Sequence, residues 1–224
     1  MEMNKNTIIL TVVSVVAIFG FLIGAYLLTN RPETPPDTTV HKELTQVKAD
    51  DRTKWSPAKK HILVEFSDLQ CPACKAFHDY SRTNIEQSKD NAAVTKTITF
   101  VYKNYPLPTV HKNAFNAAYA AEAAGRQGKF YQMADIMFDK QTEWEGSNNP
   151  MPYFENIAKQ LKLDMEKYKK DVNSKEVKDK VAADQSLGDS IGVNATPTFY
   201  LDGVKVDVNQ YSDFVTLLKE TGKK

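Results

Sequence analysis

The stretch EFSDLQCPACKAFH, residues 65–78, contains the only two cysteines of the chain, Cys71 and Cys74. Their spacing suits a redox-active pair, half of a zinc site, or a short structural disulfide. The segment HILVEFSD (61–68) is rich in β-forming side chains and is predicted to be a buried strand. From about Pro72 onward the spacing of apolar residues is helical. The cysteine pair therefore lies where a strand passes into a helix.

Cys71 is predicted to lie at the start of that helix, where backbone N–H groups of the first turn have no partner within the helix. These groups and the helix dipole stabilise negative charge, so such a site lowers a cysteine pKa from about 8.5 to roughly 3.5–7.5. Pro72 suits the first helical turn, where its missing N–H costs nothing. Cys74, one turn later, is predicted to be more buried and to act as the resolving thiol.

A metal site is the first alternative to a redox pair. Zinc needs four ligands, or three and a water, so histidines would have to complete a site that has two cysteines. His78 lies four residues after Cys74 and can share its helix face, which gives Cys71, Cys74 and His78 as a candidate copper or zinc set. A structural disulfide is less favoured, because so short a loop constrains the unfolded chain very little.

The remaining segments predict an α/β domain. TITFVYKNYPL predicts a second strand, so the first unit is strand–helix–strand with parallel strands. Ala-rich and amphipathic stretches then predict a block of helices over about 111–190. GVNATPTFYLDGVKVDV predicts two strands joined at Asp202-Gly203, and YSDFVTLLKETG predicts a last helix. The order β-α-β, helices, β-β-α indicates one α/β core with a helical insertion.

The N-terminal part predicts a membrane anchor. After a stub of residues 1–6, TIILTVVSVVAIFGFLIGAYLL (7–28) has 22 uncharged residues, enough to cross a bilayer as a helix. The apolar run is longer than that of a cleaved signal peptide and ends without a small-x-small site, so we expect an uncleaved signal anchor. Residues 29–54 are polar, with three prolines in their first half, and predict an extended linker with a short helix in its second half. The folded domain is expected over 55–224.

The charge balance argues against one class of partner. The formal net charge is +1, from 29 basic and 28 acidic residues. A nucleic-acid-binding protein needs a clustered excess of positive charge, and the basic stretches here are interrupted by acids. No nucleic-acid partner is therefore predicted.

Four segments together resemble the DsbA-like thiol:disulfide oxidoreductases, in particular the membrane-anchored bacterial kind. They are VEFSDLQCPACKAFH, FVYKNYPL, AAYAAEAAGRQGKFYQM and GVNATPTFYLDG, and the resemblance covers roughly His61 to Gly222. It implies a thioredoxin fold whose βαβ and ββα halves are separated by an inserted helical domain. It also implies that Cys71 is the attacking cysteine, that Cys74 resolves, and that Pro197 is a cis-proline lying against the pair.

The resemblance assigns two further residues. The backbone of Thr196 would pair with an extended substrate chain, a form of strand addition. Glu65 would be the acidic residue beneath the active site that helps proton transfer. The dipeptide between the cysteines is Pro-Ala, where the best-known strong oxidant of the family has Pro-His. One contribution to thiolate stabilisation is therefore missing.

The sequence thus predicts an extracytoplasmic thiol:disulfide oxidoreductase, tethered to the bacterial cell membrane by one helix, that forms disulfides in exported proteins. Disulfides form outside the cytoplasm, and no cofactor is expected. Because the chain has no second cysteine pair, a separate membrane partner, linked to quinone, must reset Cys71 and Cys74. Three alternatives stay open: a reductase or isomerase of the same fold, a metal chaperone using Cys71, Cys74 and His78, and a structural domain with an incidental disulfide.

Overall fold

The computed structural model describes residues 14, 16–26 and 38–223. The predicted spanning segment, 7–28, lies partly outside the described residues, and within it residues 16–26 are helical. None of the helices in the described residues is both long and apolar enough to cross a membrane. The stub and residues 29–37 of the predicted linker lie outside the described part of the chain. The chain divides into two units at Pro36–Asp37, and the second contains the predicted domain.

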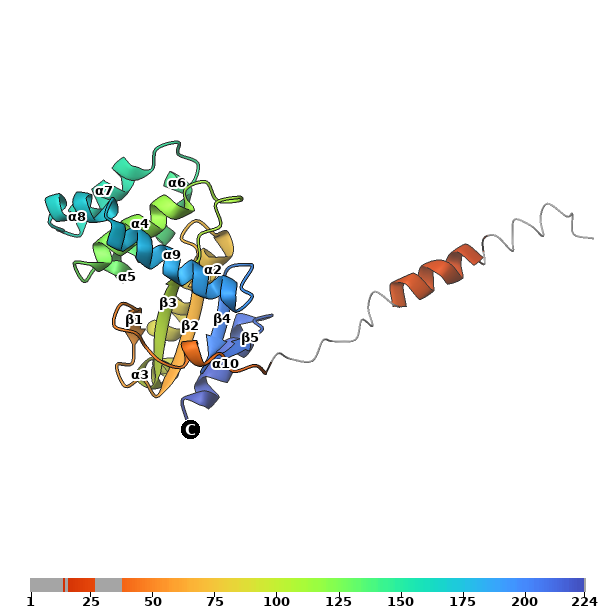
Figure 1. The fold of residues 1–224 in the computed structure, drawn as a ribbon. Helices are drawn as coiled ribbons and strands as arrows, with labels where there is room; N and C mark the ends of the chain where they lie inside the picture. The colour runs from red at the N-terminus through yellow and green to blue at the C-terminus, as the bar shows by residue number, and fades with distance from the viewer. Residues whose placement is uncertain (1–13, 15, 27–37, 224) are drawn as a thin grey trace, which may run out of the picture. The chain divides into compact units, whose positions relative to one another are not determined.

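A five-stranded sheet carries the cysteine pair. The two central strands, β2 (His61–Ser67) and β3 (Ile98–Asn104), are parallel, as predicted, and almost completely buried. β4 (Thr198–Leu201) pairs with β2, and β5 (Val204–Val206) pairs with β4, both antiparallel. β1 (Arg52–Trp55) is antiparallel to β3 at the other edge, so the strand order is β1-β3-β2-β4-β5 (Figure 1).

The predicted connections are present in the sheet. β2 leads through α2 (Pro72–Ser81), a π-helical turn η2 (Arg82–Glu86), η3 (Lys89–Asn91) and α3 (Ala92–Thr97) to the parallel strand β3. The hairpin from β4 to β5 turns at Asp202 and Gly203, whose φ angles of 51° and 84° are both positive, as a type I′ turn requires.

The helical insertion lies between β3 and β4, as predicted. Its six helices, all within the described chain, are α4 (Ala114–Gly125), α5 (Phe130–Asp139), α6 (Gln141–Trp144), α7 (Met151–Gln160), α8 (Met165–Val172) and α9 (Lys175–Ser190). The last helix of the domain, α10 (Tyr211–Thr221), follows β5. The architecture is therefore a thioredoxin-like α/β core with the expected insertion.

The two faces of the sheet are buried in two cores. On one face Phe77 of α2, Phe199 of β4 and Phe214 of α10 form a cluster with ring centroids 4.5–5.9 Å apart. On the other face Phe66 packs with its neighbours beneath α9, which crosses the sheet in Figure 1. Gly188 permits this approach, because a Cβ there would lie 2.8 Å from the Tyr105 ring. Each buried side chain of this size contributes about 1.5–3 kcal/mol relative to exposure.

The structure corrects the predicted end of the linker. Strand β1 already begins at Arg52, Leu44 is 1% exposed, and Val40 forms a bridge with Val204, so these residues belong to the domain. The predicted short helix is only the three-residue 3-10 helix η1 (Lys42–Leu44). The four residues of β1 include a single apolar side chain and show no alternation, so the free edge of β3, rather than local propensity, makes them a strand.

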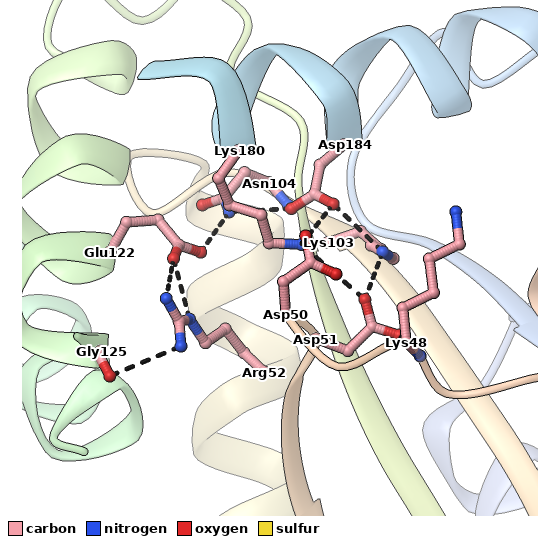
Figure 2. Close-up of polar contacts among 10 residues, drawn as sticks. All are labelled: Lys48, Asp50, Asp51, Arg52, Lys103, Asn104, Glu122, Gly125, Lys180 and Asp184. Atoms are coloured by element: carbon pink, nitrogen blue, oxygen red, sulfur yellow. Dashed lines mark hydrogen bonds and ion pairs between the residues drawn. The ribbon is translucent and has the colours of Figure 1, made fainter. Parts of the chain in front are cut away.

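A buried group of charges fastens this segment to β3 and to the insertion (Figure 2). Lys103, near the end of β3, lies 2.6 Å from Asp51 and 3.1 Å from Asp184 of α9, and all three side chains are at most 5% exposed. Lys180 approaches Asp184 to 2.8 Å. Burial opposes the charge of Lys103, but the neighbouring carboxylates outweigh burial and raise the pKa of its ammonium group.

Asn104 joins this group to a second buried ion pair. Its side-chain amide donates to Glu122 at 2.7 Å and to Asp184 at 3.1 Å. Glu122 in turn accepts from the Arg52 guanidinium, at 2.8 and 2.5 Å. The end of β3, the start of β1 and helices α4 and α9 are thus held together by one polar network.

Candidate functional site

The cysteine pair lies where the sequence predicted, at the passage from β2 into α2. A loop of residues 68–71 follows β2, and Cys71 is the N-cap of α2, with an extended backbone (φ −73°, ψ 124°) and Pro72 in the first turn. Both cysteines are free thiols. Cys71 is 6% exposed and Cys74 is 0% exposed, so the predicted order of burial holds.

The two thiols differ strongly in acidity. The hydrogen bond with Cys74 is the largest cause that lowers the pKa of Cys71, which falls to about 5 although burial opposes it. The backbone N–H groups of Ala73 and Cys74 add to this effect, as a helix N-terminus should. Burial, followed by the contact with Cys71 and the charge of Glu65, raises the pKa of Cys74 well above its usual value. At neutral pH the site therefore combines a Cys71 thiolate with a protonated Cys74.

Thr196 and Pro197 lie beside Cys71, although 125 residues separate Thr196 from it. The peptide bond between them is cis. The Sγ atom of Cys71 lies 3.4 Å from the carbonyl oxygen of Thr196. The Thr196 hydroxyl is buried and has no hydrogen-bond partner among the described residues. The structure thus brings together the residues that the family resemblance had assigned to the substrate side of the site.

Glu65 lies in the middle of β2, between Tyr102 on β3 and Phe199 on β4, and is 4% exposed. Burial raises the pKa of its carboxyl group to about 7, and its charge acts on Cys74. Glu65 also lines a cavity of about 20 Å³, together with His78 and other residues of α2 and α5. That volume suits about one water molecule. A carboxyl that titrates near neutral pH thus stands behind the buried thiol.

His78 does not complete a metal site with the cysteines. Its ring stacks on Phe138 with centroids 4.9 Å apart. In the described part of the chain, the group of metal-capable side chains whose ligand atoms come close together is His78, Asp79 and Asp139, without either cysteine. Arg82 lies 2.8 Å from Asp139 and already supplies positive charge there. The metal set of Cys71, Cys74 and His78 is therefore not assembled.

The sequence reading missed the side chains that hold the loop before Cys71. Gln141 of α6 donates to the carbonyl oxygens of Leu69 and Cys71, at 2.9 and 3.2 Å. Gln70 accepts from the Asn113 N–H at 2.7 Å and donates to a carbonyl oxygen of the insertion at 3.0 Å. These partners are 43–75 residues apart, and no local spacing pointed to them. The insertion thus fixes the backbone on which Cys71 lies.

Asp68 was missed for the same reason. Its side chain is 0% exposed, and it lies 2.8 Å from the ring of His111 in the loop after β3. Burial of an aspartate four residues before α2 was not indicated by the sequence, because SDLQ also fits a solvated loop. A buried carboxylate requires several donors, and only the tertiary structure supplies them.

Comparisons with known proteins agree with this geometry. A family model described as Thioredoxin matches residues 52–220. A curated relative, Na(+)/H(+) antiporter NhaA 1 of Mycolicibacterium vanbaalenii, is 31% identical over 175 residues, which are 77% of this chain and 27% of that protein. This chain thus spans about a quarter of the length of that relative. "Probable disulfide bond formation protein D" of Bacillus anthracis is 28% identical over 145 residues, which are 63% of this chain and 64% of that protein.

Solved structures show the same fold. BdbD from Bacillus subtilis, in its oxidised form, superposes with a TM-score of 0.65 at 20% identity and covers 84% of this chain and 100% of its own. Alpha-DsbA1 from Wolbachia pipientis superposes with a TM-score of 0.66 at 20% identity and covers 81% of this chain and 97% of its own. The similarity spans the core and the insertion together, so the expected thioredoxin fold with a helical insertion is confirmed.

Proposed function

The chain belongs to the thioredoxin family and has the DsbA-like form of its fold, and from this premise we propose that it is a thiol:disulfide oxidoreductase that forms disulfides in exported proteins. One observation carries the proposal: Cys71 is the N-cap of α2 beside the fully buried Cys74, an arrangement that lowers the pKa of Cys71 and raises that of Cys74. A stabilised thiolate favours the reduced pair, so the Cys71–Cys74 disulfide is a good acceptor of electrons.

The proposed reaction proceeds by two exchanges. A substrate thiolate attacks Sγ of Cys71, a mixed disulfide forms, and the bond to Cys74 breaks. Cys74 leaves as a thiolate and takes up a proton, because burial raises its pKa. The substrate's second thiolate then attacks the substrate sulfur of the mixed disulfide and releases Cys71 as a thiolate. The substrate loses two electrons, and the cysteine pair gains them.

Thr196, Pro197 and Glu65 have supporting roles in this proposal. The carbonyl of Thr196 faces Cys71, which supports a role for the Thr196 backbone in pairing with an extended substrate chain. Pro197 holds the chain against the pair through its cis peptide bond with Thr196. Glu65 exchanges the proton of Cys74, since it is the buried carboxyl whose charge acts on that thiol. In the reverse exchange, when the reduced pair meets a substrate disulfide, Cys71 attacks and Cys74 resolves, in keeping with their acidity.

The compartment and partners form part of the same proposal. The uncharged run of 22 residues at 7–28 supports a single membrane anchor, with the catalytic domain outside the cytoplasm of a bacterium. Thiol-containing exported proteins are the substrates. A separate membrane protein linked to quinone resets the pair, since this chain has no further cysteines for an internal relay. The name of the Bacillus anthracis relative, a disulfide bond formation protein, supports this direction.

The redox potential of the purified protein in glutathione buffers tests the direction of the reaction. We expect a value toward the −120 mV typical of strong oxidants, because Cys71 is strongly stabilised as a thiolate. A value near about −270 mV would instead indicate a reductase of the same fold, the second candidate, which the Pro-Ala dipeptide keeps in consideration. Absence of any exchange with glutathione would contradict both.

The variant Glu65→Gln first tests the raised pKa of Glu65, through the pH dependence of protein stability. Burial raises the pKa of Glu65 to about 7, so the folded state holds a proton that the unfolded state releases from about pH 4.5 upward. The free energy of unfolding of the wild type therefore falls as the pH rises from about 4.5 to 7. The side-chain amide of Gln at position 65 does not titrate, so the variant does not lose this stability. We expect about 3 kcal/mol higher free energy of unfolding at pH 8 than for the wild type, and little gain at pH 4.5. Urea unfolding at the two pH values measures this difference.

The same variant should exchange more slowly although it is more stable. Positioned proton transfer contributes about 10²-fold or more to rates, and we expect a loss of that order in stopped-flow exchange at neutral pH. Glu122→Gln is the matched control, because Glu122 is equally buried but pairs with Arg52, away from the cysteines. Equal rates for wild type and Glu65→Gln would remove Glu65 from the mechanism.

A further inference from the structure

The carboxylate of Asp68 connects the cysteine turn to the helical insertion. Its Oδ1 atom accepts from the Gln70 N–H at 2.8 Å, and its Oδ2 atom accepts from the Leu107 N–H at 2.9 Å. The ring of His111 completes the set, with Nδ1 2.8 Å from Oδ2. Leu107 and His111 both belong to the segment between β3 and α4. Asp68 therefore receives donors from the loop before Cys71 and from the start of the insertion.

The backbone of Asp68 contacts both cysteines. Its N–H donates to Sγ of Cys74 at 3.5 Å, and its carbonyl oxygen accepts from the Cys71 N–H at 3.0 Å. The side-chain contacts of Asp68 thus determine where these two backbone groups point. A loosened Asp68 would weaken the contact with Cys74 and the turn that places Cys71 at the helix N-terminus.

The charge of Asp68 matters as well as its geometry. A fully buried carboxylate this close to the cysteines destabilises a thiolate, unless hydrogen-bond donors partly neutralise the negative charge on its oxygens. Among the described residues, His111 is the only side chain that donates to this carboxylate, so its Nδ1 must carry a hydrogen. A hydrogen bond to a charged group contributes more than a neutral one. Loss of the imidazole would therefore leave more negative charge beside the cysteines.

We propose that Asp68 and His111 form a positioning pair through which the helical insertion sets the redox potential of Cys71 and Cys74. The inference rests on the proposed function and extends it, since neither residue touches the exchanging sulfur atoms through its side chain. Both effects of losing His111, the looser turn and the less compensated carboxylate, disfavour the Cys71 thiolate. The disulfide then becomes more stable and the protein a weaker oxidant.

The chain contains a matched control for this pair. His61, at the start of β2, places Nδ1 2.8 Å from Asp202, and Asp202 also accepts a backbone N–H, that of Ile62, at 2.8 Å. This second pair lies at the opposite end of β2 from the cysteine loop. The substitutions His111→Phe and His61→Phe therefore remove the same type of contact and differ in their distance from the cysteines.

The experiment equilibrates the full chain with glutathione and measures the fraction oxidised for wild type, His111→Phe, His111→Gln and His61→Phe. We expect His111→Phe to shift the equilibrium constant about tenfold toward the disulfide, which is about 30 mV for two electrons. His111→Gln, which keeps one donor, should shift it less, and His61→Phe should stay within about twofold of wild type. The rate of alkylation of Cys71 against pH should show the highest thiol pKa in His111→Phe, a smaller rise in His111→Gln and no change in His61→Phe.

Two outcomes overturn the inference. In the first, both His111 variants keep the wild-type redox potential and the wild-type pKa of Cys71. In the second, His111→Phe and His61→Phe shift the potential equally. Either result would show that the pair serves stability alone. If His111→Phe does not fold, His111→Gln decides by the same criterion. If the wild type exchanges with glutathione and these variants leave the redox potential unchanged, the inference fails but the proposed function stands. A wild-type protein without exchange contradicts the proposed function beneath it.

Discussion

The variant Cys74→Ser will accumulate mixed disulfides with substrate proteins through Cys71, and its turnover will fall to background. The Cys71 thiolate, favoured by a pKa lowered to about 5, attacks a substrate disulfide and forms a bond between the two proteins. In the wild type Cys74 lies close enough to hydrogen-bond Cys71 and breaks that bond again. Serine cannot do so, and the adduct persists. Gels run without reductant will show it, and added reductant will remove it.

Cys71→Ser is the matched control for this prediction. The remaining thiol, Cys74, is fully buried, and burial raises its pKa well above the usual value, so it is protonated and cannot be reached by a substrate. We expect no adduct and no exchange from this variant. Equal trapping by the two variants would contradict the assignment of Cys71 as the attacking residue and Cys74 as the resolving one.

Replacing Lys103 with methionine will have the largest effect on stability. The side chains of Asp51 and Asp184 are both 2% exposed and lie 2.6 and 3.1 Å from the Lys103 ammonium group (Figure 2). Removing one partner of a buried pair leaves uncompensated charge, which costs about 3–5 kcal/mol. Lys180, 2.8 Å from Asp184, offsets part of this loss, so we expect a loss near the lower end of that range. Urea unfolding of the reduced protein measures it.

Two further variants show whether the cause is burial of charge. Lys175→Met removes a lysine that is also paired with an aspartate, Asp179, but both side chains are mostly exposed, so we expect no measurable change in the urea midpoint. In the double variant Lys103→Met with Asp184→Asn, one of the two buried carboxylates that lose the Lys103 ammonium group is gone. We expect this double variant to be more stable than the sum of its single losses predicts. Additive losses would point to packing rather than charge.

The sequence allowed the central elements to be predicted because their signals are local. β2 and β3 are rich in β-branched and aromatic residues, which favour strands, and the Asp202-Gly203 turn needs two positive φ angles that this dipeptide tolerates. Cys71 and Pro72 at a strand-to-helix passage predicted the N-cap position. These features depend on residues that are neighbours in the chain, so spacing and propensity are enough.

β1 shows where local signals end. Arg52–Trp55 has no apolar alternation, and its first three residues were predicted to belong to the linker. Its backbone groups pair with the free edge of β3, and Arg52 reaches Glu122, 70 residues away, at 2.5 Å. The sequence contains no local signal that this charged segment would form an ion pair with a buried carboxylate. The energy that fixes this edge comes from tertiary ion pairs.

The chemical groups of the site could be predicted from residue type and spacing: two cysteines at the start of a helix, a proline before a strand, and an acid within a predicted buried strand. The acidity of these groups depends on contacts that form only in the folded protein. The fold buries Cys74 and brings the carbonyl oxygen of Thr196 to 3.4 Å from Sγ of Cys71. It also places the His111 ring within hydrogen-bond distance of the Asp68 carboxylate. The reason is physical, since thiol and carboxyl acidities depend on burial and on charges within a few ångströms, and most of those neighbours are distant in the chain.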